Sequence, residues 1–179
     1  MAAFSWIWRA ICKNCPSPEQ ENILKNKIDA LELELRILKL SLDDANLPVP
    51  VKKSEISIEM AREILLKIAP TAHLYLTDNI FYTVDIECFK KFIWYDVTNY
   101  NTYVAEAYDC DNFALSVLGN ANSGVWADVA IFIAWSNEHA FNIMIDDNHQ
   151  VWYIEPQTDQ IEKYIDVEDI YKPITLIYG

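Results

Sequence analysis

The pattern of apolar and polar positions changes several times along the 179 residues of this chain. Residues 1–16 hold closely spaced aromatic and aliphatic side chains, and residues 17–44 follow a seven-residue repeat. Prolines space the apolar residues of 45–53, while residues 54–179 mix short apolar runs with turn residues. This order predicts an apolar N-terminal segment, a coiled-coil helix, a linker and one folded domain.

The predicted helix of residues 17–44 begins with three agreeing signals. Ser17 is suited to the N-cap, Pro18 to the first helical position, and Gln20 completes a capping box. Apolar residues then recur at alternating spacings of four and three, which is a heptad seam. The seam consists of Leu24, Ile28, Leu31, Leu35, Leu38 and Leu42.

The charges beside this seam favour association of identical helices. Lys27 and Glu32, and likewise Glu34 and Lys39, occupy the flanking positions that meet across a parallel pair, with opposite sign both times. We therefore expect a parallel homo-oligomer through residues 24–42. An amphipathic helix packed on its own domain is the alternative.

The remaining residues predict alternating helices and strands, and so an α+β domain. Ser57 is suited to capping a helix that ends before Pro70. The further predicted elements are strands at 73–77 and 80–84, a helix at 86–95, a helix from 109 to 119, a strand at 125–135, two strands around a turn at 146–148, a short helix at 169–171 and a strand at 174–178.

Charge is distributed unevenly along the chain, whose net charge is −13. Residues 1–53 carry eight Lys and Arg against seven Asp and Glu, a net of +1, and residues 54–179 carry six against twenty, a net of −14. Nucleic acid and anionic lipid would repel so acidic a domain. Hard cations such as calcium would be attracted to it.

The termini and cysteines exclude some classes of protein. No apolar run approaches the ~18 residues of a transmembrane helix, and residues 4–11 make a poor signal peptide. We expect a soluble protein that is intracellular or part of an assembly. The four cysteines are too few for a disulfide scaffold, and the Cys12–Cys15 pair has no second pair to complete a metal site. The apolar residues of 1–15 suit either folding back on the domain or docking to a partner, a larger assembly or a membrane interface.

One stretch carries potential chemistry. Cys110 is predicted at a helix start, where backbone N–H groups stabilise a thiolate. The neighbouring carboxylates of Asp109 and Asp111 act against that, so a cation or a protonated histidine would be needed to neutralise them. A small core residue is the alternative role for such a cysteine.

The predicted hairpin brings a histidine to a carboxylate. With the turn centred at Asp147, His139 faces Glu155 on the neighbouring strand, on the same face of the sheet. Glu155 would then orient His139 as general base for Cys110 as nucleophile. An incidental surface pair is the alternative.

Three short motifs in this order resemble a known family. They are residues 108–114 (YDCDNFA), 139–142 (HAFN) and 155–159 (EPQTD). They resemble the C-terminal domain of the fairy-ring mushroom agglutinin family, over roughly residues 55–179. The resemblance implies a papain-like cysteine protease fold, dependence on calcium or manganese, and a Cys110–His139–Glu155 triad.

The resemblance also implies metal ligands, with Asp111 the best match, Gln157 next, and Asp109 and Asp128 weaker. It is incomplete, because no glutamine precedes Cys110 between residues 99 and 109 to form an oxyanion hole. Asn99, Asn101 or a backbone N–H would have to substitute.

Two functions are consistent with these patterns. The first is a metal-dependent cysteine peptidase, a hydrolase acting on protein or peptide and presented on an oligomerising stalk. The second is a non-enzymatic component of a virion or another large complex, in which the domain serves for binding. The two hypotheses differ in whether Cys110 is reactive.

Overall fold

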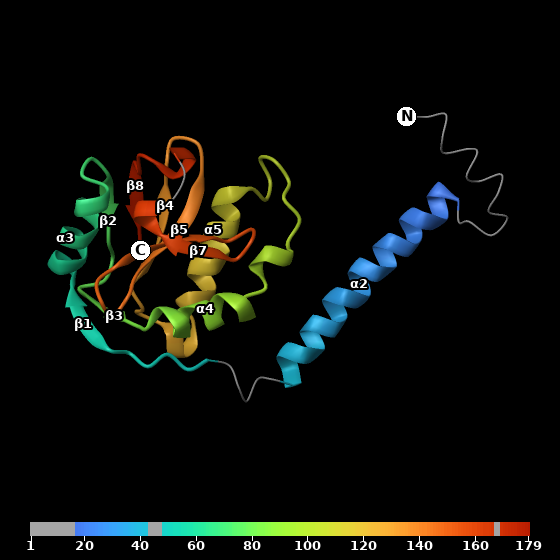
Figure 1. Ribbon diagram of the computed structural model, residues 1–179, viewed down its shortest axis with the longest axis horizontal. Helices are drawn as coiled ribbons and strands as arrows, with labels where there is room; N and C mark the ends of the chain where they lie inside the picture. Colours follow the sequence, from blue (N-terminus) through green and yellow to red (C-terminus); the bar gives the residue numbers. More distant parts are fainter. Residues whose placement is uncertain (1–16, 43–47, 167–168) are drawn as a thin grey trace. The chain divides into compact units, whose positions relative to one another are not determined.

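The computed structural model describes residues 17–42, 48–166 and 169–179. The chain divides into two compact units, Met1–Ala45 and Asn46–Gly179. In the first unit, the described residues form helix α2 (Pro18–Leu42; Figure 1). The predicted capping box is confirmed, since the Ser17 N–H donates to Gln20 Oε1 (2.8 Å) and the Gln20 N–H to Ser17 Oγ (3.2 Å). The segment 1–16, with the Cys12–Cys15 pair, lies outside the described residues.

The second unit is built on a six-stranded sheet with the order β2-β8-β4-β5-β6-β7. Its strands are β2 (His73–Tyr75), β4 (Ile131–Trp135), β5 (Ala140–Ile145), β6 (Val151–Glu155), β7 (Gln160–Lys163) and β8 (Leu176–Tyr178). A separate antiparallel pair consists of β1 (Ser54–Ser57) and β3 (Ile80–Thr83). The helices are α3 (Ile58–Ile68), α4 (Ile86–Tyr95) and α5 (Cys110–Ala121), with 3₁₀ turns at Thr98–Tyr100, Gly124–Trp126, Tyr164–Asp166 and Asp169–Tyr171.

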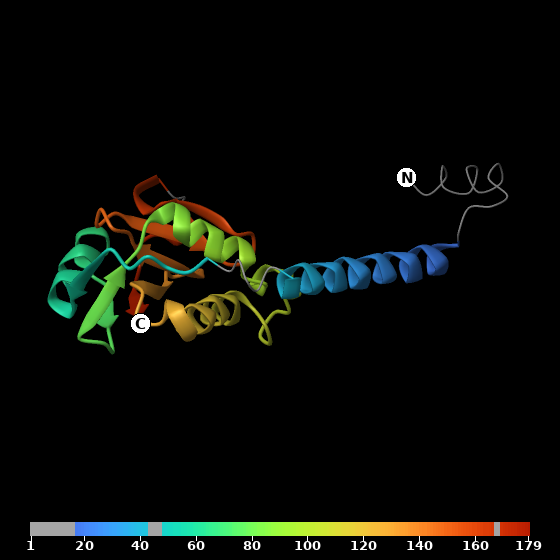
Figure 2. The ribbon, with the colours of Figure 1, turned by 90° about the horizontal axis from the view of Figure 1, so that it is seen from below.

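Alternation along the central strands divides the core into two layers (Figures 1 and 2). Phe141, Ile143 and Ile145 of β5 belong to a cluster with buried residues of α3 and β3. Ala140 and Met144 belong to a second cluster, with buried residues of α4 and α5. The sheet is therefore covered on both faces, and its accessible positions lie mainly at strand ends and edges.

Local signals explain where the helices begin. Ser57 Oγ accepts from the Met60 N–H at the start of α3, as predicted (3.3 Å). The carboxylate of Asp85 accepts from the Glu87 N–H (2.9 Å) and the Cys88 N–H (3.2 Å) at the start of α4. These caps satisfy N–H groups that the helices themselves leave unpaired.

The predicted strand at 125–135 is wrong in its first half. Residues Gly124–Trp126 form a 3₁₀ turn, and β4 begins only at Ile131. Two features prevent residues 125–130 from continuing the strand. Trp126 Nε1 donates to the Pro48 carbonyl (2.9 Å), and Asp128 adopts a φ of 65°. Strands β1 and β7 were not predicted, because both are short and their exposed polar residues mask the period of two.

The hairpin of β5 and β6 has a different register from the predicted one. Ile145 pairs with Val151 and Ile143 with Tyr153, so the turn is centred at Asn148 and not at Asp147. Asp146 causes the shift, since its Oδ1 accepts from the N–H groups of Asn148 (2.9 Å) and Gln150 (2.8 Å). The opposed position moves by two residues, which leaves every side chain on its predicted face.

This role of Asp146 predicts a stability effect. Asp146 is buried, and its Oδ2 also accepts from Trp152 Nε1 (2.8 Å). Asp146→Ala leaves three donors without their acceptor, so we expect the free energy of unfolding to fall by about 2–3 kcal/mol. Asp147→Ala is the matched control and should change it by less than about 0.5 kcal/mol. Urea unfolding measures both; equal effects would show that Asp146 does not hold the turn.

Candidate functional site

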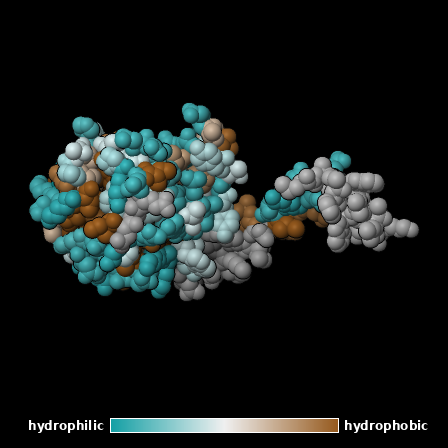
Figure 3. Space-filling model, turned by 45° about the horizontal axis from the view of Figure 1, so that its top comes forward, coloured by the Kyte–Doolittle hydropathy of each residue, from teal (hydrophilic) through white to brown (hydrophobic). Residues whose placement is uncertain are grey.

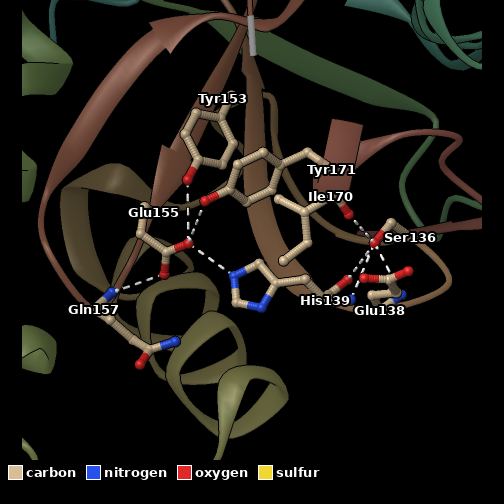
Figure 4. A network of polar contacts seen from close by, with 8 residues as sticks. All are labelled: Ser136, Glu138, His139, Tyr153, Glu155, Gln157, Ile170 and Tyr171. Atoms are coloured by element: carbon tan, nitrogen blue, oxygen red, sulfur yellow. Dashed lines mark hydrogen bonds and ion pairs between the residues drawn. The ribbon is translucent and has the colours of Figure 1, made fainter. Parts of the chain in front are cut away.

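The structure brings His139 and Glu155 together at one end of the sheet (Figure 4). His139 directly precedes β5 and Glu155 ends β6. His139 Nε2 lies 2.7 Å from Glu155 Oε2, and the side chains are 14% and 8% exposed. The pair survives the register shift because both residues remain on the same face. The imidazole edge thus reaches the surface while the carboxylate is held beneath it.

Glu155 accepts several further hydrogen bonds. Its Oε2 accepts from the Tyr153 hydroxyl (3.1 Å) and the Tyr171 hydroxyl (3.4 Å), and its Oε1 from the backbone N–H of Gln157 (3.2 Å). A buried carboxylate needs such donors, because losing water without replacement costs several kcal/mol. Figure 4 shows the Gln157 side chain extending away from Glu155, and it makes no hydrogen bond to the described residues.

The turn between β4 and β5 fixes the position of His139. Ser136 Oγ accepts from the His139 N–H (3.0 Å) and donates to the Ile170 carbonyl (2.7 Å). The imidazole lies over Phe141, with ring centroids 6.3 Å apart, and meets the edge of Tyr171 at 5.5 Å. Because backbone and ring are both held, His139 presents a single orientation to the surface.

Two buried tyrosines, Tyr153 and Tyr164, remain neutral over a wide pH range. Burial is the main cause that raises the pKa of Tyr153, and its hydrogen bond to Tyr171 and the nearby Glu155 charge act in the same direction. Burial also raises the pKa of Tyr164 to about 12. A neutral Tyr153 keeps the proton that it donates to Glu155.

Cys110 is the first residue of α5, as predicted, and is partly buried against the cluster that contains Ala140. The side-chain amide of Asn142 holds α5 on the sheet by donating to the Ala114 carbonyl (3.0 Å). Ala114 lies one helical turn after Cys110 and Asn142 lies three residues after His139, so this bond places the start of α5 near the His139 end of the sheet. Among the described residues, no hydrogen bond joins the Cys110 thiol to His139.

The structure brings two of the four predicted metal ligands, Asp109 and Asp111, together. Asp109 and Asp111 lie side by side, and the hydrogen bond between their carboxyl groups raises the pKa of Asp111. Asp128 lies three residues before the start of β4. Its carbonyl accepts from the Tyr82 N–H (2.7 Å). The described residues contain no group of three or more His, Cys, Asp or Glu placed to hold a metal ion. Calcium dependence stays a prediction from the resemblance.

The asparagines expected to replace an oxyanion glutamine are engaged elsewhere. Asn99 Nδ2 donates to Asp159 Oδ2 (2.7 Å). Asn101 Nδ2 donates to the Thr98 carbonyl (3.1 Å) and to the Tyr108 hydroxyl (2.8 Å). Both amides therefore stabilise the loop between α4 and α5 and do not converge on Cys110.

Comparison with known proteins gives likeness of fold only. No protein-family model and no curated protein matches the sequence. The chain is similar to the PSL1a–E64 complex, with a TM-score of 0.59, 16% identity, and coverage of 72% of this chain and 52% of that chain. It is also similar to Polyporus squamosus lectin bound to the human-type influenza-binding epitope Neu5Acα2-6Galβ1-4GlcNAc, with a TM-score of 0.55, 16% identity, and coverage of 72% and 50%. The match spans about half of each lectin chain.

This likeness corrects the main prediction from sequence. The papain-like fold class, the assignment to a cysteine protease domain and the hydrolase function predicted from sequence are corrected by this likeness, which is to lectin structures and is a likeness of fold alone. The alternative prediction was a non-enzymatic component of a virion or another large complex. The comparison does not support a virion component, but it agrees with non-enzymatic binding. The physical reason is that a helix-start cysteine and a His–Glu hairpin pair report local packing, which does not determine fold class or activity.

Three residues that hold His139 and Glu155 in place were not predicted from the sequence: Ser136, Tyr153 and Tyr171. Tyr153 lies two residues before Glu155 on a predicted strand. Alternation of side chains therefore predicts that both lie on the same face of the sheet. No sequence pattern indicated Ser136 or Tyr171, because their contacts depend on how the last 3₁₀ turn folds over the sheet.

In the described ranges, no helix is both long and apolar enough to cross a membrane.

The buried tyrosines predict how stability depends on pH. An unfolded chain loses tyrosine protons near pH 10, whereas folded Tyr153 and Tyr164 keep theirs. The folded state then binds more protons, so stability is full below pH 10 and falls as pH rises toward 12. The slope is at most about 1.4 kcal/mol per pH unit for each tyrosine. Tyr153→Phe should reduce the slope in urea unfolding at pH 9–11; an unchanged slope would contradict the assignment.

Proposed function

We propose that residues 48–179 form a carbohydrate-binding domain that does not transform its ligand, with His139, Glu155 and Gln157 at the binding surface. The observation that carries the proposal is the fixed imidazole edge of His139 above the buried carboxylate of Glu155. Similarity of fold to a lectin supports the class of ligand. Cys110 and the acids beside it are proposed to border this surface.

The hydrogen bonding defines what His139 offers to a ligand. A carboxylate oxygen only accepts, so His139 donates from Nε2 to Glu155. Its other nitrogen, Nδ1, makes no hydrogen bond to the described residues and, in the neutral ring, accepts from a hydroxyl. The Gln157 amide supplies both donors and an acceptor nearby. Sugars present closely spaced hydroxyl groups that suit this mixture.

Charge indicates which sugars suit the surface. The net charge of residues 54–179 is −14, and Asp109 and Asp111 lie at the start of α5. A sialic acid carboxylate would be repelled there. We therefore expect a neutral glycan such as Galβ1-4GlcNAc to bind better than Neu5Acα2-6Galβ1-4GlcNAc.

Titration calorimetry tests this site. Loss of a hydrogen bond to a ligand costs about 0.5–1.5 kcal/mol, so His139→Ala should weaken binding of Galβ1-4GlcNAc about three- to tenfold. Glu155→Gln should also weaken it, because it disturbs the group that orients the ring. His73→Ala is the matched control, since His73 is exposed on β2, and should bind like the wild type. If the wild type and all three variants bound the sugar with equal affinity, the binding site would lie away from His139 and Glu155.

The non-enzymatic part of the proposal has a separate test. A partly buried thiol with no base in hydrogen-bond contact should react slowly with a thiol-reactive epoxide. We expect Cys110 and Cys88 to be labelled at similar slow rates, as measured by mass spectrometry of peptides. Fast labelling of Cys110 that is lost in His139→Ala would contradict non-enzymatic binding.

We also propose that α2 associates with further copies of itself and so clusters the binding domains. The supporting observation is a set of exposed apolar side chains on this helix, each 42–63% exposed. They are Ile23, Leu24, Ile28, Leu31 and Leu33. The charge pattern of residues 27–39 in the sequence is self-complementary in a parallel pair. Clustering raises avidity for repeated glycans without new contacts.

Light scattering tests self-association. The full chain at micromolar concentration should have a mass that is a multiple of the 20.7 kDa of one chain. Ile28→Lys, within the apolar set, should yield the single-chain mass, while Asn26→Lys, two residues away on the polar side, should not. A wild-type protein of 20.7 kDa would exclude association through this helix.

A further inference from the structure

A second cavity lies on the far side of the turn between β6 and β7. It has a volume of about 250 Å³ and is lined by Lys90, Ile93, Trp94, Asp159 and Ile161. Trp94 is 68% exposed, which is unusual for so large an aromatic side chain. Figure 3 shows that apolar residues on the viewed face form separate patches within a mostly hydrophilic surface.

The turn after β6 leads along the chain from Glu155 to this cavity, whose Ile93 and Ile161 pack on the other face of the sheet. The N–H groups of Thr158 (3.2 Å) and Asp159 (2.9 Å) both donate to the carbonyl of Glu155. Four residues thus separate Glu155, which ends β6, from Asp159, which lines the cavity. Asp159 has a φ of 61°, and its carboxylate accepts from Asn99 Nδ2 (2.7 Å). These contacts hold its side chain in one place despite an uncommon backbone conformation.

The chemistry of the walls indicates the kind of ligand. The floor is apolar, since Ile93 is buried and Ile161 is half-buried, and the Trp94 indole offers an aromatic face. The rim carries one acceptor, Asp159, and one donor, Lys90, whose ammonium is paired with Glu87 (2.7 Å). A pyranose ring has this character, with apolar C–H faces and hydroxyls around the edge. The volume is below the ~300–1,000 Å³ typical of larger ligands, which suits a single ring.

We propose that the Trp94–Asp159 cavity is a second carbohydrate subsite, which takes the next sugar of a neutral oligosaccharide held at His139. This inference rests on the proposed function, because it extends the same binding surface. It makes the domain selective for chain length: a disaccharide reaches only the His139 surface, whereas a longer chain also contacts Trp94.

A length series tests the subsite. The wild-type protein should bind the two-repeat tetrasaccharide of Galβ1-4GlcNAc about tenfold more tightly than the disaccharide, by calorimetry. Trp94→Ala should remove that gain and leave disaccharide affinity unchanged, and Asp159→Asn should reduce the gain. Tyr75→Ala is the matched control, because Tyr75 is 66% exposed on β2, at the opposite edge of the sheet. It should keep the full gain.

The outcomes separate this inference from the function on which it rests. If the wild type binds neither saccharide, the proposed function fails and the subsite fails with it. If the wild type binds both but Trp94→Ala keeps the full gain with length, the subsite is wrong while the function stands. Thermal unfolding of Trp94→Ala near the wild-type midpoint would confirm that an exposed side chain was removed without disturbing the fold.

Discussion

The buried carboxylate of Glu155 is the constraint on which the rest of the site depends. A charge at 8% side-chain exposure must be met by donors, and four groups converge on it: an imidazole, two phenols and a backbone N–H. These donors come from the residue before β5, from β6, from the turn after β6 and from the last 3₁₀ turn. Satisfying one carboxylate therefore brings four segments of the chain together.

The same requirement explains several features around the site. Ser136 links the β4–β5 turn to the 3₁₀ turn Asp169–Tyr171, so the Tyr171 hydroxyl stays within reach of Glu155. Burial keeps Tyr153 protonated and able to donate. On the other face of the sheet, Asn142 fixes α5 through the Ala114 carbonyl. A rigid scaffold of this kind suits recognition, in which preformed groups lower the entropy cost of binding.

Much of the local structure was predictable from sequence, because it is set by local rules. The capping box at Ser17, the N-cap at Ser57 and the alternation on β5 and β6 are of this kind. Alternation alone placed His139 and Glu155 on one face, even though the register was shifted by two. Asp146 shows why the register was not predictable: a side chain that binds two N–H groups of the turn decided its centre. Tyr171 joins the site only through tertiary folding.

Fold class and function were not predictable in the same way. Short motifs at a helix start and on a hairpin were interpreted as a peptidase triad, yet the similar solved structures are those of a lectin. Local geometry of this kind recurs on unrelated scaffolds, so it identifies a site and not a reaction. The hydrogen bonds of Asn99 to Asp159 and of Asn101 to Tyr108 are structural details that the motifs could not reveal.

Nuclear magnetic resonance of the histidine rings tests the central claim most directly. The chain has three histidines, so each ring gives its own signals, and His73 and His149, both exposed, serve as internal references. On titration with Galβ1-4GlcNAc, the His139 ring signals should shift saturably while those of the other two remain unchanged, and the sugar should be recovered intact. Unmoved His139 signals in the presence of bound sugar, or a chemically altered sugar, would contradict the account.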